Sequence, residues 1–136
     1  MDAFDSDALI YATVPGHPLG ERVHRVIRAV APRTHIGSIL LVPELLIKPT
    51  RLGLRRELTD LKRLLARLSL RTPVHPTAAM SVALGARYGL KTVDAVHLAT
   101  AVLAGADRFI TNNRRDFTKD IAEIDVTYPD ELPDSG

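Results

Sequence analysis

Four acidic residues stand near positions where the sequence predicts a strand to end or a helix to begin: Asp5, Glu44, Asp94 and Asp116. Carboxylates gathered in one place repel one another, and a hard divalent cation such as Mg²⁺ or Mn²⁺ relieves that repulsion because it prefers oxygen ligands. A metal held in this way polarises a phosphodiester and lowers the pKa of a bound water. The four acids therefore predict a site for phosphodiester hydrolysis.

The segments around these acids predict an α/β fold. Short strands are expected at residues 3–4, 34–38, 108–111 and 124–127. Helices are expected after residue 6, over 19–30, after residue 42, over 54–68 and 77–88, from 92 to about 105 and, unless it is a turn, near 117, because apolar residues recur there at helical spacing or stand beside cap residues and prolines. Strands that alternate with helices indicate a central, mainly parallel sheet flanked by helices, and ligands bind beyond the carboxyl ends of such strands.

Length and composition narrow the class of protein. The chain has 136 residues, enough for one domain with a real core, and no cysteine, which excludes disulfides, thiolate zinc sites and a cysteine nucleophile. No run approaches a membrane span, and the first residues lack the features of a signal peptide, so we expect a cytoplasmic protein without membrane contact. We predict a domain over 1–127 and a tail over 128–136 that is too polar and proline-rich to pack well.

Several motifs resemble those of PIN-domain ribonucleases. Residues 4–12 (FDSDALIYA) resemble the opening motif, in which an Asp ends the first strand, and residues 92–101 and 106–117 resemble the two later acidic motifs. Pro43-Glu44-Leu45-Leu46 is similar to the weaker second motif. Chain length and motif order agree with the VapC-like toxins of type II toxin–antitoxin systems.

This resemblance implies a three-layer PIN-like domain with the activity of a Mg²⁺- or Mn²⁺-dependent endoribonuclease. The substrates of the family are structured RNAs, usually tRNA or rRNA, and a cognate antitoxin silences the enzyme by entering the acidic groove. The resemblance also implies a homodimer.

The same resemblance assigns roles to individual residues. Asp5 and Asp94 would be the principal metal ligands, and Glu44 would assist them. The fourth acidic position is filled either by Asp116 or, where many relatives have Asp, by Asn113.

Three further side chains stand beside these acids. Ser6 and Thr111 would support the site by hydrogen-bonding a ligand or a phosphate oxygen. Asp7 adds a negative charge where the family more often has Asn or Ser, which bears on the number of metal ions and the strength of catalysis.

Each acid also has a structural interpretation. Asp5 and Asp116 are common types of turn or cap residue, Asp94 in a first helical turn is stabilised by the helix dipole, and Glu44 is a possible partner for an arginine. His97 stands three residues after Asp94, but we expect it to be a packed or hydrogen-bonded core histidine.

Basic residues are concentrated in one part of the chain. The segment from Lys48 to Arg71 holds eight basic and two acidic residues, a net charge of +6, within a chain whose net charge is +2. Such a segment is either a solvated helix face or an RNA contact, for which Arg51, Arg55 and Lys62 are the candidates. With six aromatic residues in all, base stacking is not expected to be the main mode of RNA binding.

Two other functions remain open at this stage. The residues Phe4 to Asp7 also resemble the Asp-x-Asp nucleophile motif of haloacid-dehalogenase-like phosphatases, although only 25 residues follow Thr111, too few for the rest of that fold. The chain is alternatively a catalytically weakened PIN-like domain that binds RNA or a partner without cutting, an interpretation motivated by Asp7 and Asn113.

Overall fold

The computed structural model describes residues 1–134, which fold into five strands, six α-helices and one short 3-10 helix. In chain order the elements are β1 (Asp2–Phe4), α1 (Ser6–Ala12), α2 (Pro18–Arg28), β2 (Ile36–Ser38), α3 (Leu41–Leu52), α4 (Arg55–Ala66), β3 (Ser69–Arg71), α5 (His75–Tyr88), α6 (Thr92–Leu103), β4 (Arg108–Ile110), β5 (Asp125–Thr127) and η1 (Pro129–Glu131). None of the helices within residues 1–134 is long and apolar enough to cross a membrane.

The strands form one parallel sheet in the order β3-β2-β1-β4-β5. The first strand lies in the middle, where Ala3 is opposite Ile36 of β2 and Phe109 of β4. Because all the pairings are parallel, the carboxyl ends of the strands meet at one edge of the sheet. The predicted α/β class with a mainly parallel sheet is confirmed.

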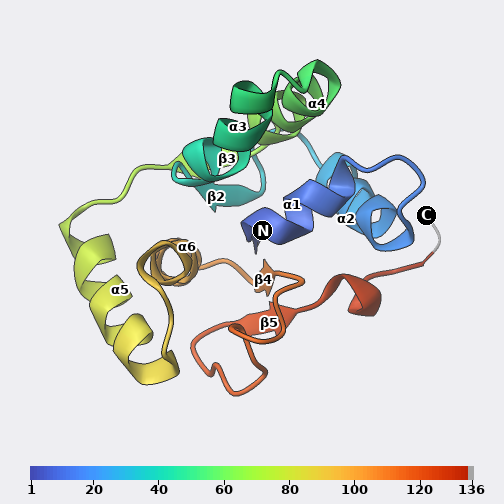
Figure 1. Cartoon of the computed structure of the whole chain (residues 1–136). Coiled ribbons are helices and arrows are strands. Elements are labelled where there is room, and N and C mark those ends of the chain that lie inside the picture. Colours follow the sequence, from blue (N-terminus) through green and yellow to red (C-terminus); the bar gives the residue numbers. More distant parts are fainter. Residues whose placement is uncertain (135–136) are drawn as a thin grey trace.

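Successive side chains of each strand point to opposite faces of the sheet, and each face has its own core. Phe4 and Ile110 are buried with residues of α1 to α4, whereas Ala3 and Phe109 are buried with residues of α5 and α6. Figure 1 shows α1 and α2 on one side of the strands and α5 and α6 on the other. The predicted three-layer arrangement is therefore confirmed.

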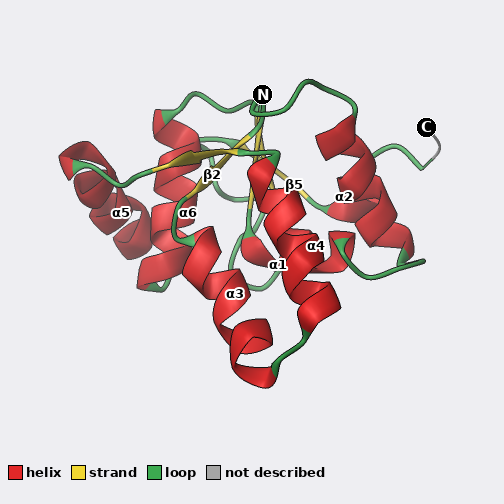
Figure 2. Ribbon diagram, turned by 90° about the horizontal axis from the view of Figure 1, so that it is seen from above, coloured by secondary structure: helices red, strands yellow, loops and turns green. Residues whose placement is uncertain are grey.

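Helices α3 and α4 form a hairpin that projects from the body of the molecule (Figure 2). Gly53 closes the hairpin in the left-handed conformation, with φ 66°, which glycine adopts without strain. Beside it Leu52 and Leu54 are exposed, while Leu61 and Leu65 of α4 are buried against the core. The helix predicted over residues 54–68 from the spacing of its apolar residues is thus confirmed as α4, except that Leu54 precedes the helix and is exposed.

Two regions differ from the expectations. Strand β3 was not predicted, because its three residues are an edge strand with little apolar content and follow a helix directly. The expectation that the chain packs poorly after residue 127 is wrong for Tyr128 and Leu132, which are buried, and the Tyr128 hydroxyl donates to the carbonyl of Phe117 at 2.8 Å. The boundary of the tail stays a prediction, and its residues 135 and 136 lie outside the described part of the chain.

Candidate metal centre at the carboxyl edge of the sheet

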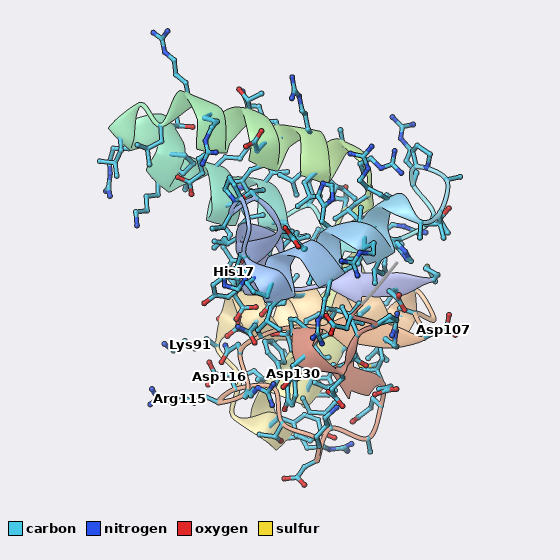
Figure 3. All side chains as sticks on the ribbon, turned by 90° about the vertical axis from the view of Figure 1, so that its right-hand side faces the viewer. His17, Lys91, Asp107, Arg115, Asp116 and Asp130 are labelled. Carbon is cyan, nitrogen blue, oxygen red and sulfur yellow. The ribbon has the colours of Figure 1, made fainter. Side chains whose placement is uncertain are left out.

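The acids singled out in the sequence come from elements that begin at the carboxyl edge of the sheet. Asp5 follows β1 directly, Glu44 and Asp94 lie in the first turns of α3 and α6, and Asp116 lies in the loop after β4. Figure 3 shows Asp116 at the same end of the molecule as Lys91, which precedes α6. The parallel topology is therefore what brings residues 22 to 111 positions apart in the chain to one end of the fold.

Asp5 is the most buried of these carboxylates, with 2% of its surface exposed. Its Oδ2 accepts a hydrogen bond of 2.8 Å from the Thr111 hydroxyl, and its Oδ1 is buried without a hydrogen-bond partner among the described residues. Burial, followed by the negative charge of Asp7, raises the pKa of Asp5 to about 7 in the metal-free protein. A bound cation would therefore stabilise the ionised form of Asp5.

Asp7 fixes the loop that follows β4. Its Oδ1 accepts hydrogen bonds from the backbone N–H of Asn112 at 3.0 Å and, at 3.3 Å, from the hydroxyl of Thr111. The same Thr111 oxygen accepts from the backbone N–H of Asn113 at 3.0 Å. The start of α1 and the end of β4 are therefore held together beside Asp5.

Glu44 and His97 form a hydrogen-bonded pair across the edge of the sheet. The Nε2 of His97 donates to the Oε1 of Glu44 at 2.8 Å; the histidine side chain is fully buried, whereas 30% of the Glu44 side chain stays exposed. Burial acts to raise the pKa of Glu44, but the hydrogen bond and charge of His97, with a hydrogen bond from Ser6, outweigh it and leave that pKa below its usual value. Glu44 is therefore a charged carboxylate at neutral pH, held in place by its histidine partner.

One oxygen each of Asp5 and Glu44 and one ring nitrogen of His97 all lie within 4.8 Å of one another. Atoms at this mutual distance can share one metal ion, since typical metal–ligand bonds are about 2.0–2.2 Å long. Three distant parts of the chain thus converge on one point.

Asp94 and Asp116 extend the negative charge around this point. Burial, followed by the charges of Glu44, Asp116 and Asp7, raises the pKa of Asp94 above its usual value. Asp116 is held by Asn113, whose side-chain amide donates to Asp116 Oδ2 at 2.9 Å and whose side-chain oxygen accepts from the Asp116 backbone N–H at 3.2 Å. Asn113 and Asp116 therefore act together in one loop.

Comparison with known proteins agrees with this geometry. A model of the PIN domain family matches residues 3–123. The chain belongs to the PIN domain family. A solved structure, a toxin–antitoxin complex from Klebsiella pneumoniae, superposes on this PIN domain with a TM-score of 0.74 and 26% sequence identity, covering 95% of this chain and 98% of that one. The curated proteins contain no significant match to the chain.

Within this PIN domain the structure brings two of the four predicted acids, Asp5 and Glu44, together with His97, and Thr111 hydrogen-bonds to Asp5. Among the described residues Asp94 and Asp116 lie outside this group, although their charges reach it. The predicted RNA contacts lie elsewhere, exposed on the α3–α4 hairpin: Arg51, Arg55 and Lys62.

His97 is the residue whose position the sequence did not reveal. The expectation of a hydrogen-bonded core histidine is correct as to burial, but the partner is Glu44 and the bond lies in the centre of the site. The available signal was its spacing of three residues from Asp94, which places both side chains on neighbouring parts of α6.

The donor set fits a divalent cation. Asp5 offers a buried oxygen without a partner, Glu44 offers an oxygen that is partly open to solvent, and Asp94 adds a third carboxylate whose ionisation a cation would favour. The carboxylates suit Mg²⁺ or Mn²⁺, and the imidazole suits a transition metal better than it suits Mg²⁺.

Proposed function

We propose that this PIN domain is a Mg²⁺- or Mn²⁺-dependent endoribonuclease. The observation that carries the proposal is the convergence of Asp5, Glu44 and His97, whose ligand atoms lie within 4.8 Å of one another, together with the buried Oδ1 of Asp5, which has no hydrogen-bond partner among the described residues. Asp5, Glu44 and Asp94 would hold the metal, and Asp116 would position water or a second ion. When bound, the ion would polarise the scissile phosphodiester and lower the pKa of a water molecule.

The residues around the carboxylates would keep the site preorganised. The Thr111 hydroxyl fixes the orientation of Asp5, and His97 fixes that of Glu44, so that neither side chain must be reoriented when a cation arrives. Ser6, at the start of α1, acts to lower the pKa of Glu44 and would also hydrogen-bond a phosphate oxygen.

The test is cleavage of a panel of tRNAs and rRNA fragments by the purified protein with Mg²⁺ or Mn²⁺. We expect cleavage by the wild type, none with EDTA, and none by Asp5→Asn or Asp94→Asn. The matched control is Asp120→Asn, an equal change of charge at an exposed position, which should cleave like the wild type. Unchanged cleavage by both site variants would refute the assignment.

A second candidate is a PIN domain that binds RNA or a partner without cutting it. It is favoured by one observation: the Asn113 amide already occupies Oδ2 of Asp116, which leaves one oxygen of the fourth carboxylate for a metal or water. RNA binding that persists in EDTA, with no cleavage under either metal, would select this candidate. The phosphatase alternative is not supported, because the chain belongs to the PIN domain family.

We also propose that the protein is the toxin of a toxin–antitoxin pair, works in the cytoplasm and forms a homodimer. Support for an antitoxin partner comes from the Klebsiella pneumoniae structure, which is itself a toxin–antitoxin complex. A small DNA-binding protein encoded next to this chain should copurify with it and suppress cleavage. Light scattering after gel filtration should give twice the 14.9 kDa chain mass for the protein alone.

A further inference from the structure

A second polar cavity lies away from the acidic residues, where α1, α2 and α4 meet. It has a volume of about 310 Å³ and is lined by Thr13 at the end of α1, by His24 and Arg28 of α2, and by Arg63 and Arg67 at and after the end of α4. Helix α1 separates this cavity from Asp5, and its seven residues span about 10 Å at 1.5 Å per residue. The cavity is therefore distinct from the metal centre but within reach of the same ligand.

The arginines of this cavity have no carboxylate partner. Within residues 1–134 no ion pair up to 4.0 Å involves Arg28, Arg63 or Arg67, although one acid, Asp60, also lines the cavity. One Nη of Arg67 donates to the carbonyl of Val30 at 3.1 Å, while its Nε is buried without an acceptor among the described residues. The cavity thus gathers positive charge that the rest of the fold does not neutralise.

The charges of these arginines act on His24, which also lines the cavity. Burial, followed by the charges of Arg28 and Arg67, lowers the pKa of His24 below its usual value. The same field that disfavours a proton on His24 favours an anion at this position.

An adjoining depression continues the cavity along the loop between α1 and α2. It shares His24 and Arg28 with the cavity, adds Arg25, and follows the α1–α2 loop at Pro15 and Gly16. That loop leads to His17, which Figure 3 shows at the same end of the molecule as Asp116. The depression thus adds Arg25 to the basic surface beside the cavity.

We infer that the cavity lined by Arg28, Arg63 and Arg67 binds a backbone phosphate of the RNA whose scissile bond lies at the metal centre. The inference rests on the proposed nuclease function and adds a subsite to it. Arginine suits phosphate because its planar fork makes two parallel hydrogen bonds to phosphate oxygens. A polyanion is favoured over a single acidic side chain because further basic residues, Arg51 and Arg55, are exposed on the α3–α4 hairpin, where a longer anion can also contact them.

The experiment measures binding of a fluorescein-labelled single-stranded RNA by anisotropy, in EDTA and at several KCl concentrations. The test variant is Arg28→Gln with Arg63→Gln, because both side chains are exposed and neither donates a hydrogen bond within the described residues that the fold would lose. The control is Lys48→Gln with Arg56→Gln, which removes equal charge from exposed positions of the hairpin that do not line the cavity.

Each lost phosphate contact lowers the slope of log K against log salt by about 0.7 for single-stranded RNA, which is about fivefold in affinity for each tenfold change in salt. The cavity variant should therefore lose about 0.7 in slope and bind about fivefold more weakly at about 0.1 M salt than the wild type, with the two proteins converging near 1 M. The control should change affinity by less than about twofold, and cleavage with Mn²⁺ should show a raised KM and unchanged kcat for the cavity variant alone.

Equal effects in the cavity variant and the control would overturn the inference, because they would reflect only the general field of the basic surface. Unchanged RNA binding by the cavity variant would also overturn it, and would do so in favour of an acidic protein segment if binding of a partner protein were lost instead. The expected binding pattern without any cleavage by the wild type would leave the subsite standing and refute the nuclease. Cleavage by the wild type, together with an unchanged KM in the cavity variant, would support the nuclease and refute the phosphate subsite.

Discussion

Replacement of Asp5 by Asn should stabilise the metal-free protein at neutral and alkaline pH. The folded state raises the pKa of this carboxyl from 3.8 to about 7, chiefly by burial and then by the charge of Asp7. Between these two values the folded protein holds a proton that the unfolded chain has released, so the free energy of unfolding falls as pH rises. The loss of stability begins near the pKa of Asp5 in the unfolded chain and is complete above the pKa of Asp5 in the folded protein.

The size of the effect follows from the width of this interval. About three pKa units at about 1.36 kcal/mol each give an upper limit of about 4 kcal/mol above pH 7. The asparagine keeps an oxygen that can accept from Thr111, but its amide adds a donor that needs a partner, so we expect a net gain of about 2 to 4 kcal/mol.

The assay is urea unfolding in EDTA across a series from about pH 4 to about pH 8. The difference between Asp5→Asn and the wild type should be small at the acidic end and reach its full value at the alkaline end. The exposed control Asp120→Asn should show a difference that does not grow with pH. A variant that is equally or less stable than the wild type at alkaline pH would show that burial of the Asp5 charge is not costly, and the reasoning for a cation at this site would fail.

Three further expectations concern the same parts of the fold. Mn²⁺ should raise the melting temperature of the wild type at alkaline pH and leave Asp5→Asn unchanged, because only the folded wild type binds the ion. In His97→Leu the pKa of Glu44 should rise, because burial is then opposed by fewer favourable contacts, and carbon NMR of the carboxyl would measure it. Gly20→Ala should destabilise by at least about 2 kcal/mol in urea, because its Cβ would lie 1.8 Å from the Tyr11 carbonyl oxygen, whereas Gly85→Ala, with no atom nearer than 3.5 Å, should not destabilise.

Residue types and spacing predicted the fold class and the convergence of Asp5 and Glu44. The signal was strong because parallel strands deliver their carboxyl ends to one edge whatever the lengths of the connections. The position of His97 could not be read in this way. Its ring reaches Glu44 only because α6 packs beside β2 and the start of α3, a contact between elements far apart in the chain.

Dependence on packing between distant segments also explains why the sequence did not predict the basic cavity or the burial of Tyr128. Arg63 lies in α4 and Arg67 directly after it, among exposed basic neighbours, and their spacing alone does not separate residues that face a cavity from residues that face solvent. Tyr128 follows a short final strand in a polar segment, and its burial depends on the loop around Phe117. Such features are decided by packing between distant segments, which local sequence patterns do not encode.

The most direct measurement is anomalous scattering from crystals of the wild-type protein soaked in Mn²⁺. We expect a peak within coordination distance of carboxylate oxygens of both Asp5 and Glu44, about 2.1 Å from each, and its disappearance in Asp5→Asn. A Mn²⁺ peak elsewhere on the molecule, with Asp5 and Glu44 contacting only protein atoms, would contradict the metal centre.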